Sequence, residues 1–358
     1  MGLANASRGD VVAFPESVAS PLRVIDEIPS IGRLEPLDSY HGGLIALIRQ
    51  LLADGAEALE VTRTVGHLND TLTSRLLGLA EAELGPPPCR YAWLSLGSQG
   101  RGEQVLSSDQ DSALAYEGAG TDQHDFGDYF GPLAGLVVAA LARAGLPLCA
   151  GGYMATNWCH PIEEFRRLFR GWVECPEPDA LLRAEIFLDV RPVHGDLSID
   201  VLDRILASGA YRPRFLVMLA RAAVTFRPPI GRFGRLRVED SAVDVKRAGI
   251  VAIVLLARLY ALAAGSSART TALRLNDAAT AGSIGRARAG NLTEGYRFLT
   301  GLRLRHQLAQ ASRGEPADNV VPLAELTAQE QQRLREVLRA VRDIQDLTAS
   351  RFATHTVM

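Results

Sequence analysis

Apolar residues recur at helical spacing in the first part of the chain. Two stripes lie between positions 38 and 84, and they consist of Leu44, Leu47, Ile48, Leu51 and Leu52, and of Leu68, Leu72, Leu76, Leu77 and Leu79. This spacing predicts amphipathic helices, and consecutive prolines at 86–88 mark their end. Residues 1–35 are polar and contain three prolines, so we expect them to be extended or poorly ordered. The helices could dock a partner, but the pattern is more typical of a helical cap on the next domain.

The middle of the chain predicts short strands and helices. Residues 91–96 and 113–116 are apolar runs of strand length, and helices are expected over 129–144 and 161–173. Residues 184–193 form another apolar run, which we interpret as a strand that contains the acid Asp189. Because burial of an unpaired carboxylate is costly, we expect Asp189 either to pair with Arg191 or to meet a metal ion.

The last part of the chain predicts helices. Residues 247–264 are almost continuously apolar, which indicates a buried helix, and residues 333–352 carry one apolar face, which indicates an amphipathic helix. The patterns together predict three regions. These are an N-terminal extension with a helical segment over 1–88, a domain of strands and helices over 89–205, and a C-terminal helical domain over 206–358.

Composition narrows the classes of partner. The chain of 358 residues is 47% hydrophobic and 22% charged, with a formal net charge of −3, so no general basic field attracts nucleic acid. No signal segment opens the chain, and arginines interrupt the longest apolar runs, so we expect no membrane association. The four cysteines match no zinc-binding spacing, which favours reduced thiols in a cytoplasmic protein.

The strongest chemical signal is the segment GSQGRGEQVLSSDQD at 97–111. On a strand, Asp109 and Asp111 would share one face, and two such close carboxylates repel unless a cation lies between them. Mg²⁺ prefers oxygen ligands together with phosphate oxygens. Gly97 permits a close approach of the backbone to a ligand, and the guanidinium of Arg101 suits a phosphate. The simpler alternative is a glycine-rich turn followed by a solvated acidic loop.

This segment resembles the nucleotidyltransferase superfamily of the DNA polymerase β type, whose signature is a strand, a Gly-Ser turn, a short helix, and a strand with two acids one residue apart. The sequence is most similar to signal-transduction nucleotidyltransferases related to the N-terminal domain of PII uridylyltransferase, which often accompany CBS and cyclic-nucleotide-binding modules. The matching positions are Gly97, Ser98, Gly100, Arg101, Glu103, Gln104, Ser108, Asp109, Gln110 and Asp111. Further matches are CAGGYMATN (149–157), IFLDVRPVHGD (186–196), DVKRAG (244–249) and LRLRHQL (302–308), so the resemblance spans about residues 89–350.

The resemblance implies an α+β fold: a polymerase β-like domain with a small mixed sheet, followed by a C-terminal helical bundle and preceded by N-terminal helices. It implies two Mg²⁺ ions, or Mn²⁺, held by three catalytic and metal-binding acids, with Asp189 in the place of the third. It also implies a nucleotide site, made of Gly97, Ser98, Arg101, Ser108 and Lys246. Lys246 could instead be a solvated surface lysine, since only Gly249 remains of the glycine run that follows this lysine in the family.

The function implied is transfer of a nucleoside monophosphate from an NTP to an acceptor hydroxyl, with UMP or AMP transfer to a small regulatory protein as the first hypothesis. One alternative is a nucleotide-binding regulatory module without turnover. Another is a nucleotidyltransferase acting on a small molecule, which would need an acceptor pocket between the catalytic and helical domains. The apolar C-terminal helices would also allow a homodimer, although packing within one chain explains them equally well.

Overall fold

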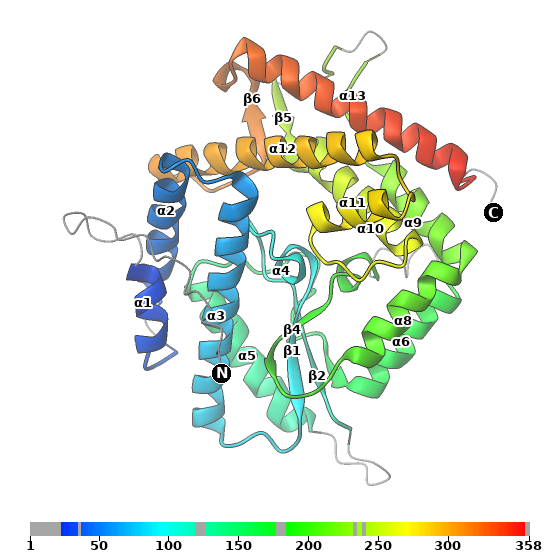
Figure 1. Cartoon of the computed structure of the whole chain (residues 1–358). Helices are drawn as coiled ribbons and strands as arrows, with labels where there is room; N and C mark the ends of the chain where they lie inside the picture. The colour runs from blue at the N-terminus through cyan, green and yellow to red at the C-terminus, as the bar shows by residue number, and fades with distance from the viewer. Residues whose placement is uncertain are drawn as a thin grey trace, which may run out of the picture.

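The computed structural model describes residues 23–34, 37–118, 126–176, 184–231, 235–237 and 241–354, and Figure 1 shows their arrangement. The predicted α+β fold class is confirmed, because a small mixed sheet with flanking helices precedes a helical C-terminal part. The helices before the C-terminal part are α1 (Arg23–Ser30), α2 (Asp38–Ala53), α3 (Ala58–Leu84), α4 (Gly97–Arg101), α5 (Gly127–Arg143), α6 (Ile162–Glu174) and α8 (Asp200–Ser208). The strands of the sheet are β1 (Tyr91–Ser95), β2 (Ser112–Tyr116), β3 (Cys159–Pro161) and β4 (Arg191–Gly195).

The sheet has the order β3-β2-β1-β4. Strand β1 is antiparallel to both of its neighbours, with Ser95 opposite Ser112 on β2 and opposite Arg191 on β4, while β2 and β3 are parallel. All five residues of β1 and all five of β2 are buried, which explains why their sequences are apolar runs without alternation. The end of β1 and the start of β2 therefore lie side by side, and this edge of the sheet carries the candidate site.

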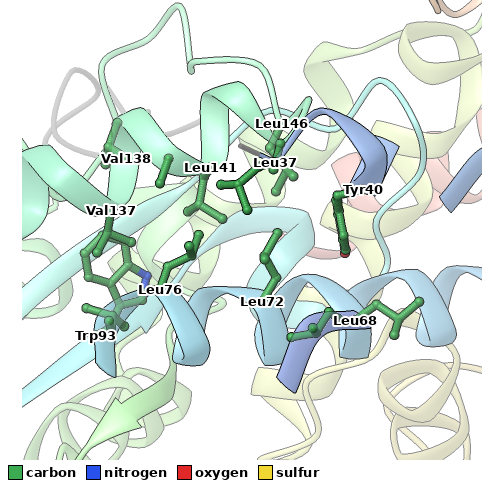
Figure 2. Close-up of a cluster of buried hydrophobic side chains, with 14 of the residues drawn as sticks. Leu37, Tyr40, Leu68, Leu72, Leu76, Trp93, Val137, Val138, Leu141 and Leu146 are labelled. Carbon is green, nitrogen blue, oxygen red and sulfur yellow. The ribbon is translucent and has the colours of Figure 1, made fainter. Parts of the chain in front are cut away.

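Helices cover both faces of this sheet. Helices α3 and α5 lie on one side and α6 and α8 on the other (Figure 1). On the α3 side, Trp93 of β1 packs in a core with Leu72, Leu76 and Val137 (Figure 2). On the opposite side, Leu94 packs in a core with Phe165, Phe169 and Trp172 of α6, the helix that was predicted over 161–173. The alternate residues Trp93 and Leu94 thus anchor the strand to separate cores.

The C-terminal part is a helical bundle with a small two-stranded sheet. Its elements are α9 (Pro213–Thr225), β5 (Ala242–Asp244), a π-helical turn (Lys246–Ile250), α10 (Val251–Ala263), α11 (Thr271–Thr280), α12 (Arg286–Ser312), β6 (Val320–Pro322) and α13 (Ala328–Arg351). Helix α10 is buried along nearly its whole length, as its continuous apolar sequence predicts. Helix α12 crosses the molecule beside α3, and α13 lies outermost (Figure 1). Thr327 begins α13 with a capping box, in which its hydroxyl accepts from Glu330 N at 3.2 Å.

Two sequence predictions of local structure are wrong. Residues 23–30 form helix α1 although the N-terminal segment was expected to be extended, because Val24 and Ile28, four residues apart, are buried against α2 and α3. The rest of that prediction, residues 1–22, lies outside the described residues. The predicted strand over 184–193 is also wrong, because residues 184–187 are helical, 188–189 form a turn, and β4 begins only at Arg191. This apolar run is buried on several sides, so its sequence lacks a period that separates helix from strand.

The helices of the described residues include no candidate for a membrane span, since none combines sufficient length with sufficient hydrophobicity.

Candidate active site

The Gly-Ser turn connects the end of β1 to the short helix α4. Gly97 has a φ of +51°, and a Cβ at this position would lie 2.5 Å from Oδ2 of Asp111. A Cβ at Gly100 would lie 2.0 Å from the backbone carbonyl oxygen of Asp189. Both glycines are therefore required by close approaches, one to an acid side chain and the other to the backbone that precedes β4.

The two acids Asp109 and Asp111 lie immediately before β2 rather than on it. The structure nevertheless brings them together, because one ligand atom from each and the Sγ of Cys149 lie within 4.8 Å of one another. Asp111 is buried, whereas Asp109 is partly exposed. Burial, reinforced by the negative charge of Asp109, raises the pKa of Asp111 to about 7. Two adjacent acids with too little compensating charge are a fitting donor set for a divalent cation.

A cavity of about 390 Å³ opens beside these acids, between the sheet and the C-terminal helices. Every residue predicted to bind the nucleotide lines it, namely Gly97, Ser98, Arg101, Ser108 and Lys246, together with Asp109 and Asp111. Lys246 comes from the π-helical turn that leads into α10, so segments more than 130 positions apart in the sequence meet here. The opposite wall is apolar and comes from the same turn and from α10, with Ile250, Val251, Val254 and Leu255.

Asp189, the predicted third acid, is not part of this group. It is fully buried and does not line the cavity. Its Oδ2 accepts hydrogen bonds from Arg101 and from Arg258 Nη2, the latter at 2.6 Å, and its Oδ1 accepts from Arg274 Nη1 at 2.6 Å. Burial alone would raise the pKa of Asp189, but the three guanidinium groups outweigh it and hold that pKa below its usual range. Asp189 is thus an anion enclosed by arginines, which bind both of its oxygens.

The alternative partner expected for Asp189, Arg191, binds elsewhere. Its Nη2 donates to Asp70 Oδ2 at 2.6 Å and to the backbone oxygen of Gln99 at 3.1 Å, and its Nε donates to the backbone oxygen of Gly100 at 3.1 Å. Arg191 therefore ties β4 and α3 to the short helix α4. It positions the Gly-Ser turn without lining the cavity.

Arg101 is held in place from both sides. Its Nε donates to Oε2 of Glu103 at 2.6 Å, and its Nη1 donates to Asp189. Glu103 in turn accepts from the backbone N and the hydroxyl of Thr271, at 2.6 and 2.9 Å. Glu103 therefore links Arg101 to the start of α11.

Three residues of the cavity were missed by the sequence reasoning. Cys149 was interpreted as a plain buried thiol, because its place beside the acids depends on the loop that follows α5. Arg303 belongs to the matching run LRLRHQL, and its Nε donates to Asn319 at 2.6 Å while its Nη2 donates to Ser107 at 3.0 Å. Burial lowers the pKa of Arg303 to about 10. Glu185 was visible as a polar residue in an apolar run, and burial raises its pKa.

Comparison with known protein families agrees with this geometry. Residues 43–179 match the family model described as "Putative nucleotidyltransferase DUF294", and residues 213–352 match the model described as "Putative nucleotidyltransferase substrate binding domain". No curated protein matches the chain. The first match contains the Gly-Ser turn and both acids, and the second contains Lys246, α10 and Arg303, so the cavity draws its walls from both. The chain therefore belongs to the nucleotidyltransferase family that these two models describe.

Proposed function

We propose that the cavity is the active site of a metal-dependent nucleotidyltransferase that moves a nucleoside monophosphate from an NTP to an acceptor hydroxyl. The observation that carries this proposal is the meeting of Asp109 and Asp111 with the Gly-Ser turn and Lys246 in one cavity. Acids alone would fit many cation sites, and a basic turn alone would fit many anions. Their combination suits a triphosphate with its metal ion.

Asp109 and Asp111 would hold Mg²⁺, or Mn²⁺ in its place. The bound ions supply neutralisation of the triphosphate charge and polarisation of the acceptor oxygen. Ser98 and the backbone amides after Gly97 would donate to phosphate oxygens, while Lys246 would place a cation at the same phosphates. Arg101 would add a fixed guanidinium, because Glu103 and Asp189 already restrict its orientation. Such a site works mainly by positioning the reactants and by stabilising the charge that develops.

The transfer forms a bond between the acceptor oxygen and the α-phosphorus and breaks the bond from that phosphorus to the leaving pyrophosphate. The acceptor hydroxyl also loses a proton. Besides Asp109 and Asp111, two described carboxylates line the cavity and could accept this proton. Glu103 is occupied by Arg101 and Thr271, whereas Glu185 lies outside the group formed by Asp109, Asp111 and Cys149. Burial raises the pKa of Glu185, which makes it a stronger base, so we assign it the acceptance of this proton.

The acceptor would contact the apolar wall formed by the residues that begin α10. The first hypothesis remains a hydroxyl on a small regulatory protein, with UMP or AMP transferred. A small-molecule acceptor is the second, and one observation favours it: the cavity lies between the two parts of the chain and has an apolar wall at Ile250, Val251, Val254 and Leu255. A regulatory nucleotide-binding module without turnover would use the same cavity and differ only in lacking product formation.

The first test is binding of ATP, UTP, CTP and GTP with Mg²⁺, measured by titration calorimetry. We expect one nucleotide to bind only when Mg²⁺ is present, and we expect Asp109→Asn to weaken this binding by roughly a hundredfold, since a carboxylate ligand of the ion is lost. Asp196→Asn, which changes an exposed acid outside the cavity, is the matched control and should bind normally. Normal Mg²⁺-dependent binding by Asp109→Asn would refute the proposed site.

A further inference from the structure

A second cavity, of about 260 Å³, lies on the other side of Arg258 from the acids. It is formed by α8, α10, the loop before α11, and α11 itself. Its lining holds the cations Arg258, Arg269 and Arg274 against a single acid, Asp203. The proposed nucleotidyl transfer uses none of these four residues.

Arg258 is the member of this group whose hydrogen bonds are incomplete. Only 6% of its surface is exposed, and its Nη2 donates to Asp189, but its Nε and Nη1 have no hydrogen-bond partner among the described residues. Buried donors without a partner are costly, and guanidinium donors are suited to an oxyanion. The side chain lines both cavities.

Several cations lie close together around Arg258. Arg274 shares Asp189 with Arg258 and Arg101, and Arg101 is also paired with Glu103, so three cations meet two carboxylates there. Burial lowers the pKa of Arg274, and the neighbouring cations Arg258 and Arg101 lower it further against the opposing effect of Asp189. Arg269 is bound to Asp203 at 3.1 Å and to the backbone oxygen of Val190 at 3.2 Å, at a partly exposed position. An anion in the cavity would therefore meet a group of close cations, and a rotation of the Arg258 side chain would bring its two unpaired donors to that anion.

We propose that this second cavity binds the phosphate group of a small molecule, through Arg258 at its inner end with Arg269 and Arg274 beside it. A tetrahedral phosphate offers oxygens to several guanidinium groups at once, whereas a carboxylate offers two oxygens in one plane. The ligand can be free phosphate or a small phosphate ester, since the two share the group that the arginines recognise.

Two routes connect this cavity to the nucleotide site. Asp189 bonds Arg258 and Arg274 on one side and Arg101 on the other. Glu103 bonds Thr271, at the start of α11, and again Arg101. A bound phosphate would attract Arg258 and Arg274 and so weaken their pairing with Asp189. Asp189 would then attract Arg101 more strongly and draw it away from the triphosphate. The two ligands would thus oppose each other, and by linkage the effect is reciprocal.

Titration of inorganic phosphate and of glycerol 3-phosphate into the full chain, in buffer free of Mg²⁺, tests the site. We expect Arg269→Ala and Ala207→Glu to weaken binding at least about fivefold, because the first removes a cation and the second adds a negative charge to the exposed lining of the cavity. Ala207→Gln is the matched neutral control and should bind normally. Lys246→Ala should also bind normally, because Lys246 lines only the nucleotide cavity. The tighter of the two probes then tells a free ion from an ester, and binding of either supports the site.

Two results would overturn the inference while leaving the nucleotidyl transfer untouched. One is absence of binding to the wild-type chain. The other is binding that Lys246→Ala removes and Ala207→Glu leaves unchanged, since the phosphate would then occupy the nucleotide cavity. For the coupling, we expect saturating phosphate to weaken Mg²⁺-NTP binding by about fivefold, and we expect Ala207→Glu to abolish this effect. An unchanged nucleotide affinity would contradict the proposed connection through Arg101.

Discussion

Asp111 combines burial with a neighbouring negative charge, and this combination defines the chemistry of the site at the residue scale. A carboxylate in such surroundings is unstable as an anion unless a cation compensates it, which raises its pKa to about 7. The same property makes it a sensitive reporter of metal binding. Where Asp189 has three arginines to stabilise its charge, Asp111 has mainly the thiol of Cys149 beside it and the more distant charges of Lys246 and Arg101.

Asp111→Asn should therefore stabilise the metal-free protein at pH 8. Folding raises the pKa of Asp111, so above pH 7 the ionised carboxylate lowers the free energy of unfolding of the wild type. This cost shrinks as the pH falls and vanishes near pH 4, which is about the pKa of the same carboxyl in the unfolded chain. The stabilisation at pH 8 should reach up to about 4 kcal/mol in the free energy of unfolding. Urea denaturation at pH 8 and pH 4 measures it, with Asp196→Asn as control.

Added Mg²⁺ should make wild type the more stable of the two proteins. The ion compensates the charge of Asp111 in wild type, whereas the variant lacks this carboxylate as a ligand. A metal-free Asp111→Asn that is no more stable than wild type at pH 8 would show that the carboxylate is already compensated within the protein.

At the scale of elements, the short helix α4 is fixed by its backbone more than by its side chains. Gly97 and Gly100 allow α4 to lie against Asp111 and against the backbone at Asp189, while Arg191 of β4 binds the carbonyl oxygens of Gln99 and Gly100. The Gly-Ser turn is therefore held rigidly between β1 and β4. A phosphate-binding turn benefits from this rigidity, because less order must be gained when the ligand binds.

Gly100→Ala is expected to destabilise the protein by about 2–4 kcal/mol and to weaken nucleotide binding, since the new methyl group would collide with backbone that cannot rotate away. Gly78→Ala is the matched control. It lies within α3 with no atom near its added Cβ, so it should stabilise the protein by about 0.5–1 kcal/mol through helix propensity. Denaturant unfolding and nucleotide calorimetry measure both variants. Equal stability of the two variants would show that α4 can shift without cost.

At the scale of the whole molecule, Asp189 joins the sheet to the helical bundle. Its carboxylate bonds Arg101 of α4, Arg258 of α10 and Arg274 of α11, so both walls of the active-site cavity are tied to one buried charge. The cavity thus exists only when the two parts are docked.

Asp189→Asn should consequently destabilise the chain by about 3–5 kcal/mol, because three buried guanidinium groups would lose their counter-charge. If Asp189 were instead a metal ligand like Asp109, its substitution would abolish metal binding and leave stability nearly unchanged. Guanidinium unfolding without metal, compared with Asp109→Asn, distinguishes these roles.

The sequence by itself determined the elements with a clear local signature. Strands β1 and β2, helices α5, α6 and α13, and the Gly-Ser turn followed by Asp109 and Asp111 are each encoded within a few consecutive residues, as apolar periodicity or as a motif. For α1 the helical spacing of Val24 and Ile28 was present, but it lies in a short polar segment with several prolines. The run that contains Asp189 failed for another reason, because burial on several sides removes the polar positions from which a period is read. Only the tertiary structure decided which charges compensate which. Asp189 was assigned to a metal by its place in a motif, but the arginines of α10 and α11 reach it from positions about 70 and 85 residues later in the chain. The loop after α5 placed Cys149 with the acids, and the docking of the bundle placed Arg303 and the apolar start of α10 in the cavity. Such contacts between distant segments follow from packing and leave no local pattern.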